Sequence, residues 1–237
     1  MLPSPKLHAV LLDLDGLMID SEPIYRLAWQ SAAADLGYEL TDAFYLTLIG
    51  LSDRDSERIL IQAFGPNFPL ARFRVLWPAR WRHQVEVSGI PVKPGLWEFL
   101  KVMEGHHLLA AVATSSDAEQ AEMSLRAAGL SQRFSCVVTG NQVLNGKPAP
   151  DIFLEAARRL AIHPQNCVVL EDSDAGILAA AAAGIPALVI PDLKPPSGEA
   201  AALALGIFSS LKEAAEFVED IFQSRDHYSE NRLPKAR

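Results

Sequence analysis

The chain has 237 residues, of which 49% are hydrophobic and 21% are charged, and its formal net charge is −8. These proportions are typical of an ordinary globular protein with one large domain, or one domain that carries a smaller insertion. Because an acidic surface repels nucleic-acid phosphates and anionic lipids, neither nucleic acid nor a membrane is an expected partner. The same charge repels a phosphorylated metabolite, so any anion site here must supply its own local positive charge.

The two cysteines, Cys136 and Cys167, each lie in an apolar run that includes paired valines. We expect buried free thiols, which suit a reducing cytoplasm. No charged segment followed by an apolar one opens the chain, so no signal peptide is expected. The longest apolar stretch, residues 177–190, is shorter than the roughly 20 residues that span a bilayer, and Gly184 and Pro186 interrupt it. We therefore expect a soluble, cytoplasmic protein.

In chain order, the first predicted element is a strand over residues 8–12, apolar at nearly every position as a central parallel strand should be. The pattern then becomes helical, with little strand signal, in four successive segments. These segments cover residues 22–37, 42–48, 53–64 and 70–87. We predict an all-helical insertion over residues 18–88, and Pro91 and Pro94-Gly95 mark the return to the core.

Short β-branched strands alternate with helices from about residue 91 onward. The strands are predicted over 108–113, 135–139, 167–170 and 187–190, and the helices over 118–128, 151–160 and 175–183. This alternation predicts a doubly wound α/β fold, with about five or six parallel strands and right-handed crossovers. Residues 1–17 and 89–224 form this core, an amphipathic helix over 211–222 closes it, and residues 225–237 are a polar tail.

Two carboxylates directly follow the first strand, in the sequence Asp13-Leu14-Asp15-Gly16. They emerge at the carboxyl edge of the sheet, where open α/β folds place their sites. One carboxylate can attack phosphorus, while the other protonates the leaving oxygen and later takes a proton from water. Taken alone, these residues suit a solvated strand-to-loop turn equally well.

A second acidic pair, Glu171-Asp172, ends the predicted strand 167–170 at the same edge. Like charges that converge there repel each other unless a cation neutralises them, and hard oxygen ligands favour Mg²⁺. The alternative is that Asp172 or Ser173 caps the following alanine-rich helix. Capping and metal binding are compatible, so both interpretations stand.

Thr114-Ser115 follows another strand and precedes a helix, so its hydroxyls and N–H groups can cradle a phosphate. Serine and threonine are also the commonest helix caps. Lys147 lies in a loop stiffened by Pro148 and Pro150, where it could neutralise phosphate or transition-state charge. A solvent-exposed lysine is the alternative.

These four motifs, in this order, resemble those of the haloacid dehalogenase-like (HAD) superfamily. The resemblance covers nearly the whole chain and is carried by DLDGLMIDSE, VATSS, GKPAPDIF and residues 169–184. The chain looks like the branch with a helical cap inserted after the first motif. That branch includes phosphoglycolate, sugar-phosphate and pseudouridine-5'-phosphate phosphatases and β-phosphoglucomutase. The resemblance implies a Rossmann-like core and a hydrolase.

The resemblance also implies catalytic roles. Asp13 would be the nucleophile that forms an aspartyl-phosphate, and Asp15 the general acid and base. Thr114 and the Ser115 backbone would hold the transferring phosphoryl group, and Lys147 would pair with Asp13 and with phosphate.

Metal and substrate residues follow from the same resemblance. Mg²⁺ would be bound by Asp13, by the main-chain carbonyl of Asp15 and by the second acidic pair, with Asp172 direct and Glu171 direct or through a water. Gly16 would lie at the phosphate. Arg54, in a segment that resembles the family's substrate loop, would contact a distal group of the substrate.

The chain also discriminates among relatives. Dehalogenases of the superfamily lack the second carboxylate, so Asp15 favours phosphoryl transfer. The β-phosphoglucomutases carry a histidine ten residues after the general acid-base, where this chain has Tyr25. Tyrosine cannot handle protons in the same way near neutral pH. We therefore predict a Mg²⁺-dependent phosphatase of small phosphorylated metabolites, a monomer or weak dimer, with a phosphosugar mutase and a catalytically silent binding protein as alternatives.

Overall fold

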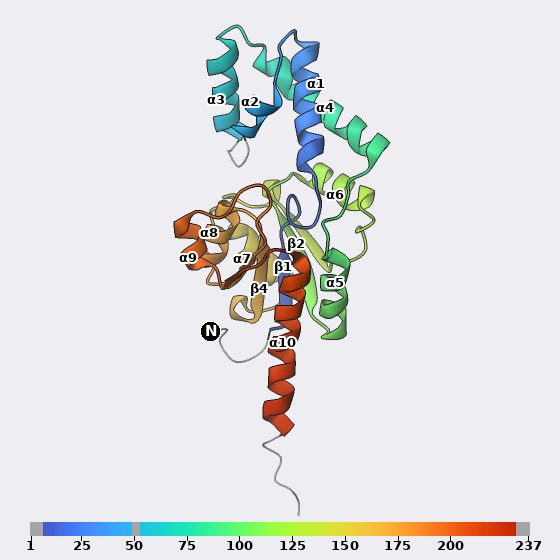
Figure 1. Cartoon of the computed structure of the whole chain (residues 1–237), viewed down its shortest axis with the longest axis vertical. Helices are drawn as coiled ribbons and strands as arrows, with labels where there is room; N and C mark the ends of the chain where they lie inside the picture. The colour runs from blue at the N-terminus through green and yellow to red at the C-terminus, as the bar shows by residue number, and fades with distance from the viewer. Residues whose placement is uncertain (1–6, 49–52, 231–237) are drawn as a thin grey trace, which may run out of the picture.

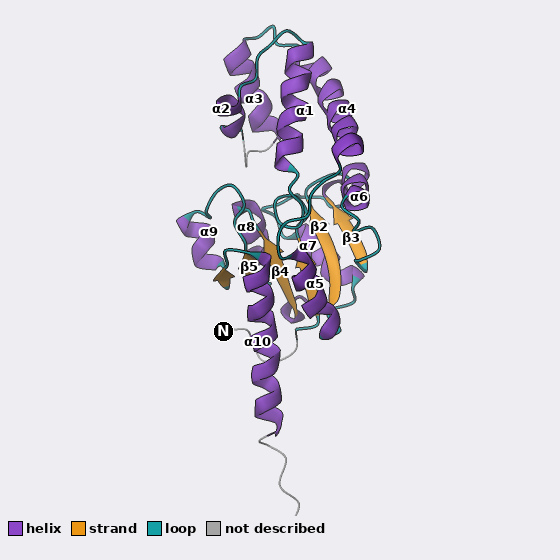
Figure 2. Ribbon diagram, turned by 45° about the vertical axis from the view of Figure 1, so that its right-hand side comes forward, coloured by secondary structure: helices purple, strands orange, loops and turns teal. Residues whose placement is uncertain are grey.

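The computed structural model describes residues 7–48 and 53–230, and the side chains of these residues except 53, 54 and 224–230. Within these residues the strands form one six-stranded sheet in the order β3-β2-β1-β4-β5-β6. Every neighbouring pair is parallel (Figure 2). The strands are β1 (Ala9–Leu12), β2 (Leu109–Thr114), β3 (Cys136–Thr139), β4 (Cys167–Glu171), β5 (Ala187–Val189) and β6 (Gly206–Ile207). The predicted parallel α/β fold is confirmed.

The central strand β1 is buried on both faces, as its continuous apolar run predicts. Because side chains alternate along a strand, Val10 and Leu12 belong to one apolar cluster, while Ala9 and Leu11 belong to another. The first cluster also contains residues of α5 (Leu96–Gly105), α6 (Ala118–Ala127) and α10 (Leu211–Glu230). The second contains residues of α7 (Asp151–Arg159) and α8 (Asp174–Ala182). Helices therefore cover both faces of the sheet.

In the described part of the chain between β1 and α5 there are four helices, and they match the four helical segments predicted for the insertion. They are α1 (Glu22–Asp35), α2 (Asp42–Leu46), α3 (Asp53–Phe64) and α4 (Leu70–Ser88). Since the chain enters α1 shortly after the carboxyl end of β1, the four helices lie beyond that end of the sheet (Figure 1). They share an apolar cluster of their own, rich in aromatic rings. We refer to residues 22–88 as the helical insertion.

Two short segments join the helical insertion to the sheet, and they are hydrogen-bonded to each other. The N–H of Asp20 donates to the carbonyl of Pro91 over 2.9 Å, and the N–H of Lys93 donates to the carbonyl of Met18 over 2.9 Å. Between these bonds, Ile19 and Val92 form an antiparallel bridge. The segment that leads into the helical insertion and the segment that leads back to the sheet therefore run side by side.

Several predicted boundaries need correction. Helices α5 and α9 (Gly198–Leu203) and strand β6 were not among the predicted elements. Helix α10 continues to Glu230, so the predicted helix end at residue 222 is wrong. The apolar periodicity of this segment does end near residue 222. Once a helix is nucleated, however, polar residues of adequate propensity extend it without an apolar face.

Both cysteines are free, as predicted, with Cys167 buried and Cys136 half-buried. Burial raises the pKa of Cys167 to about 11 and also raises the pKa of Cys136. Among the described residues, no helix combines the length and apolar character needed to cross a bilayer.

We predict that Leu12→Ala lowers the free energy of unfolding by about 2–5 kcal/mol, because Leu12 has no exposed surface in the centre of the sheet. Urea unfolding would measure the loss. The matched control is Leu144→Ala, since Leu144 is 92% exposed and its truncation should change stability by less than about 0.5 kcal/mol. Equal effects of the two substitutions would contradict the placement of β1 at the core.

Candidate active site

The predicted motifs meet at one edge of the sheet because they follow neighbouring parallel strands. Asp13 comes directly after β1, and Thr114 and Glu171 are the last residues of β2 and β4. Strand β1 pairs with both β2 and β4, and the N–H of Asp13 donates to the carbonyl of Leu170 over 3.0 Å. The structure therefore brings the first, second and fourth motifs together.

Lys147 joins this group as a buried cation. Its Nζ lies 2.5 Å from Oδ1 of Asp13 and 2.5 Å from Oε1 of Glu171. The lysine side chain is 4% exposed, so the alternative of a solvent-exposed loop lysine is wrong. Burial by itself would lower the pKa of Lys147, but the carboxylates of Asp13 and Glu171 raise it above its ordinary value. The ammonium therefore stays charged.

The charge state of Asp13 is finely balanced. Burial raises its pKa to about 7, although Lys147 acts in the opposite direction, and the nearby charge of Glu171 raises it further. A carboxylate that accepts a second positive neighbour in this environment would be stabilised in its ionised form. The site thus favours an additional cation next to Asp13.

The second oxygen of Glu171 is also occupied. Its Oε2 accepts hydrogen bonds from the N–H groups of Asp172 (2.9 Å) and Ser173 (3.0 Å) and from the hydroxyl of Ser173 (2.9 Å). This carboxylate therefore lies against the first turn of α8, where a Cβ on Gly176 would come within 1.8 Å of its Cδ atom. Ser173 also caps α8 by accepting from the N–H of Gly176, so the predicted cap is confirmed for Ser173.

Asp15 is held by hydroxyl groups. Its Oδ1 accepts from Ser21 over 2.7 Å, and its Oδ2 accepts from Ser116 over 2.8 Å and from Thr114 over 3.5 Å. The N–H of Ser116 in turn donates to the Thr114 hydroxyl over 3.1 Å. Behind this turn, Gly140 packs so closely that a Cβ there would lie 2.3 Å from the carbonyl oxygen of Ser115. The predicted Thr114-Ser115 segment is therefore fixed beside Asp15.

Asp172 and a residue that the sequence reasoning missed, Asp192, both approach Gly16. A Cβ on Gly16, which has a positive φ of 84°, would lie 2.5 Å from Oδ2 of Asp172 and 3.3 Å from Oδ2 of Asp192. Burial, together with the charges of Glu171 and Asp13, raises the pKa of Asp172 well above its ordinary value. Asp192 is ion-paired with Lys93. The sequence does carry a signal for Asp192, because this residue follows a predicted strand, as the other acidic residues of the site do.

This acidic edge fits Mg²⁺ in its donor chemistry. The carboxylates of Asp13 and Asp172 both have raised pKa values, so their ionised forms are stabilised by an added cation. Carboxylate and carbonyl oxygens are the ligands that Mg²⁺ prefers. Among the described residues, no three acidic, histidine or cysteine side chains already form a metal cluster. A Mg²⁺ ion here would therefore be bound by the carboxylates of Asp13 and Asp172 together with a main-chain oxygen.

The helical insertion contributes polar side chains opposite this edge. Burial raises the pKa of Glu22, the nearby charges of Asp192 and Asp15 raise it further, and the Tyr45 side chain acts in the opposite direction. Arg26 lies 3.5 Å from Asp42, with which it forms an ion pair. Glu22 and Tyr45 were missed as site residues, although Glu22 stands in the first motif. The side chain of Arg54 lies outside the described residues, so its predicted contact stays a prediction.

The family model described as "Haloacid dehalogenase-like hydrolase" matches residues 10–190. The chain belongs to this family, as the motifs predicted. The match includes the ends of β1, β2 and β4 and the loop that carries Lys147, and it also includes the whole helical insertion.

Three relatives illustrate the range of the similarity. A phosphorylated-carbohydrate phosphatase of Thermotoga maritima is 33% identical over 179 residues, which cover 76% of this chain and 82% of the relative. The fructose-1-phosphate phosphatase YqaB of Escherichia coli is 34% identical over 182 residues, covering 76% of this chain and 94% of the relative. A solved Thermotoga maritima structure, provisionally identified as a β-phosphoglucomutase, is 29% identical with a TM-score of 0.77, covering 90% of this chain and 99% of that chain.

We predict that Gly176→Ala lowers the free energy of unfolding by at least about 2 kcal/mol, because the new methyl group would displace the Glu171 carboxylate from its buried partners. Gly198→Ala is the matched control, since a Cβ there meets nothing within 4 Å in the first turn of α9. That variant should stay within about 1 kcal/mol of the wild type. A tolerated Gly176→Ala in urea unfolding would mean that Glu171 does not need this position.

Proposed function

We propose that this protein is a phosphatase that hydrolyses small phosphomonoesters through an aspartyl-phosphate on Asp13. The observation that carries the proposal is the pairing of Asp13 with the buried Lys147 ammonium, next to a second carboxylate, Asp15, held by hydroxyls. The Lys147 ammonium opposes the rise that burial causes in the pKa of Asp13, and so favours the ionised form of that carboxylate. The Asp15 carboxylate is oriented by the hydroxyl groups of Ser21 and Ser116 and lies two residues further along the chain. This placement suits it to transfer a proton.

The reaction has two steps. In the first, an oxygen of Asp13 bonds to phosphorus while the bond from phosphorus to the ester oxygen breaks, and Asp15 gives its proton to that oxygen. In the second, water gives a proton to Asp15 and bonds to phosphorus, and the acyl-phosphate bond breaks to release inorganic phosphate. Lys147 balances the growing negative charge, while Thr114 and the Ser115 backbone hold the phosphoryl oxygens.

Asp13, Asp172 and the main-chain carbonyl of Asp15 would hold Mg²⁺, which supplies positive charge to the phosphoryl oxygens. Glu171 already has a partner for each oxygen, so we assign it an indirect role, through Lys147 or through a water. Gly16 lets the chain pass close to Asp172 at this point, since a side chain would collide with that carboxylate.

The substrate class comes from the relatives and from the helical insertion. Two relatives are named for phosphatase activity on sugar phosphates. The insertion carries Glu22, Tyr45 and Arg26 opposite the catalytic edge, and these are groups that hydrogen-bond hydroxyls. We propose that residues 18–88 act as a cap that closes over a sugar or nucleoside phosphate and excludes water, with Arg54 in contact with a distal group. A cytoplasmic location agrees with the free thiols. We propose a monomer or weak dimer.

A phosphosugar mutase is the second candidate, because a solved neighbour is provisionally identified as a β-phosphoglucomutase. In that reaction the acyl-phosphate returns to a sugar instead of passing to water. Tyr25, which stands where the mutases have histidine, argues against it. A catalytically silent binding protein is the third candidate. The presence of every required side chain makes it the weakest.

We predict Mg²⁺-dependent release of inorganic phosphate from at least one member of a panel of sugar and nucleoside monophosphates. Excess chelator should abolish the release, and added Mg²⁺ should restore it, since the acidic edge lacks enough positive charge for a phosphate. Isomer formation would be followed on the same samples. Isomerisation without net phosphate release would favour the mutase. Absence of activity in both assays would favour the binding protein.

We predict that Asp13→Asn lowers turnover more than about 1,000-fold while the fold persists, because an amide oxygen is a poor nucleophile. Phosphate release measures the loss, and circular dichroism checks the fold. Asp220→Asn on the exposed face of α10 is the control and should keep full activity. Near-normal turnover in Asp13→Asn would overturn the mechanism.

A further inference from the structure

The carboxylate of Asp192 is a further acidic group at the catalytic edge, and none of the four motifs contains it. It lies in the segment between β5 and α9, which starts where the N–H of Ile190 donates to the carbonyl of Glu171 over 2.8 Å. At the other end of the segment, the N–H of Ser197 donates to Oδ1 of Asp174 over 3.0 Å. The segment that carries Asp192 is therefore fixed at both ends, first to β4 and then to α8.

The two oxygens of the Asp192 carboxylate have different neighbours. Oδ1 contacts Nζ of Lys93, and the side chains of the two residues are only 13% and 22% exposed, respectively. Oδ2 approaches Gly16, where a Cβ would lie 3.3 Å from it and 2.5 Å from Oδ2 of Asp172. The Oδ2 atoms of Asp172 and Asp192 are therefore less than about 6 Å apart, a separation over which two charges in a protein interact appreciably.

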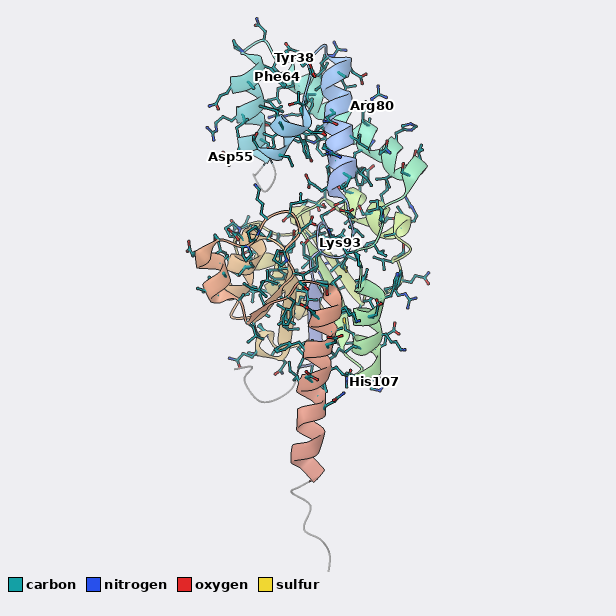
Figure 3. All side chains as sticks on the ribbon, viewed as in Figure 1. Tyr38, Asp55, Phe64, Arg80, Lys93 and His107 are labelled. Carbon is teal, nitrogen blue, oxygen red and sulfur yellow. The ribbon has the colours of Figure 1, made fainter. Side chains whose placement is uncertain are left out.

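Lys93 lies where the chain returns from the helical insertion to the sheet (Figure 3). Its Nζ has a second acidic neighbour, Oδ1 of Asp20, at 3.7 Å. The Asp20 side chain is 43% exposed, so water and salt screen its charge more than that of Asp192. Lys93 therefore balances mainly Asp192. The ion pair places one carboxylate oxygen toward Asp172 and an ammonium on the other oxygen of the same carboxylate.

We propose that the ion pair of Asp192 and Lys93 tunes the affinity of the acidic edge for Mg²⁺. The inference rests on the proposed function, in which Asp13 and Asp172 bind the cation. The Asp192 carboxylate increases the attraction of this edge for a divalent cation, and the Lys93 ammonium offsets part of that attraction. Neither side chain has to touch the ion, because residues behind the ligands of a metal site change its affinity by about 10–100-fold.

The test is a calorimetric titration of the metal-free protein with Mg²⁺, which measures the dissociation constant without turnover. Asp192→Asn removes the carboxylate charge and leaves the Lys93 ammonium without its nearer partner. The dissociation constant should therefore rise about tenfold. Lys93→Met removes the ammonium and leaves the carboxylate, so the dissociation constant should fall by about threefold or more.

A double variant separates the effect of charge from an effect on structure. Lys93→Met combined with Asp192→Asn removes one charge of each sign, so the two shifts should cancel and the dissociation constant should lie within about twofold of the wild type. Asp20→Asn is the matched control, because it removes the more exposed carboxylate beside the same lysine. It should change the dissociation constant less than about twofold. Circular dichroism checks the fold of each variant.

Shifts of the same sign in the two single variants would overturn the inference, because the pair would then only hold the returning segment in place. A double variant that binds Mg²⁺ as weakly as Asp192→Asn would overturn it too. If the wild type binds Mg²⁺ and releases phosphate but Asp192→Asn has an unchanged dissociation constant, this inference alone is lost. A wild type that binds no Mg²⁺ and hydrolyses no ester removes the proposed function as well.

Discussion

The rest of the site depends on one buried ammonium group, that of Lys147, between the carboxylates of Asp13 and Glu171. Two unpaired carboxylates at this depth would cost on the order of several kcal/mol. The cation therefore allows Asp13, directly after β1, to lie beside Glu171 at the end of β4. Glu171 extends the arrangement, because its other oxygen binds the first turn of α8 and Gly176 leaves room for it. The lysine thereby joins two strands, a helix and its own loop.

The same interaction leaves the site short of positive charge. One ammonium faces three carboxylates, those of Asp13, Glu171 and Asp172. Burial is the main cause of the raised pKa values of Asp13 and Asp172, and this deficit of positive charge adds to it. A phosphate dianion would enlarge the deficit. The proposed divalent cation and the hydroxyls around Asp15 therefore act together. The cation would compensate charge near Asp13, the proposed nucleophile, and the hydroxyls hold Asp15, the proposed proton donor, without adding charge.

The sheet and the catalytic edge were predictable because their signals are local. A buried strand followed at once by acidic or hydroxyl residues places Asp13, Thr114 and Glu171 at one edge whatever the loops do. The pairs that depend on tertiary placement were not predictable. Lys93 meets Asp192 from 99 positions away in the chain, beneath the helical insertion (Figure 3). No sequence pattern around Lys93 or around Asp192 predicts this contact.

The helical insertion is joined to the sheet by two crossings, paired through Ile19 and Val92, and has an aromatic core of its own. Rings such as Phe64, Phe68 and Phe73 pack on one another away from the catalytic edge. Substitutions among the outer helices can therefore accumulate without disturbing the packing beneath Asp13. Under the proposed function, a lineage with this architecture can change its substrate over evolutionary time through substitutions in the helical insertion, while the residues at the edge of the sheet are inherited unchanged.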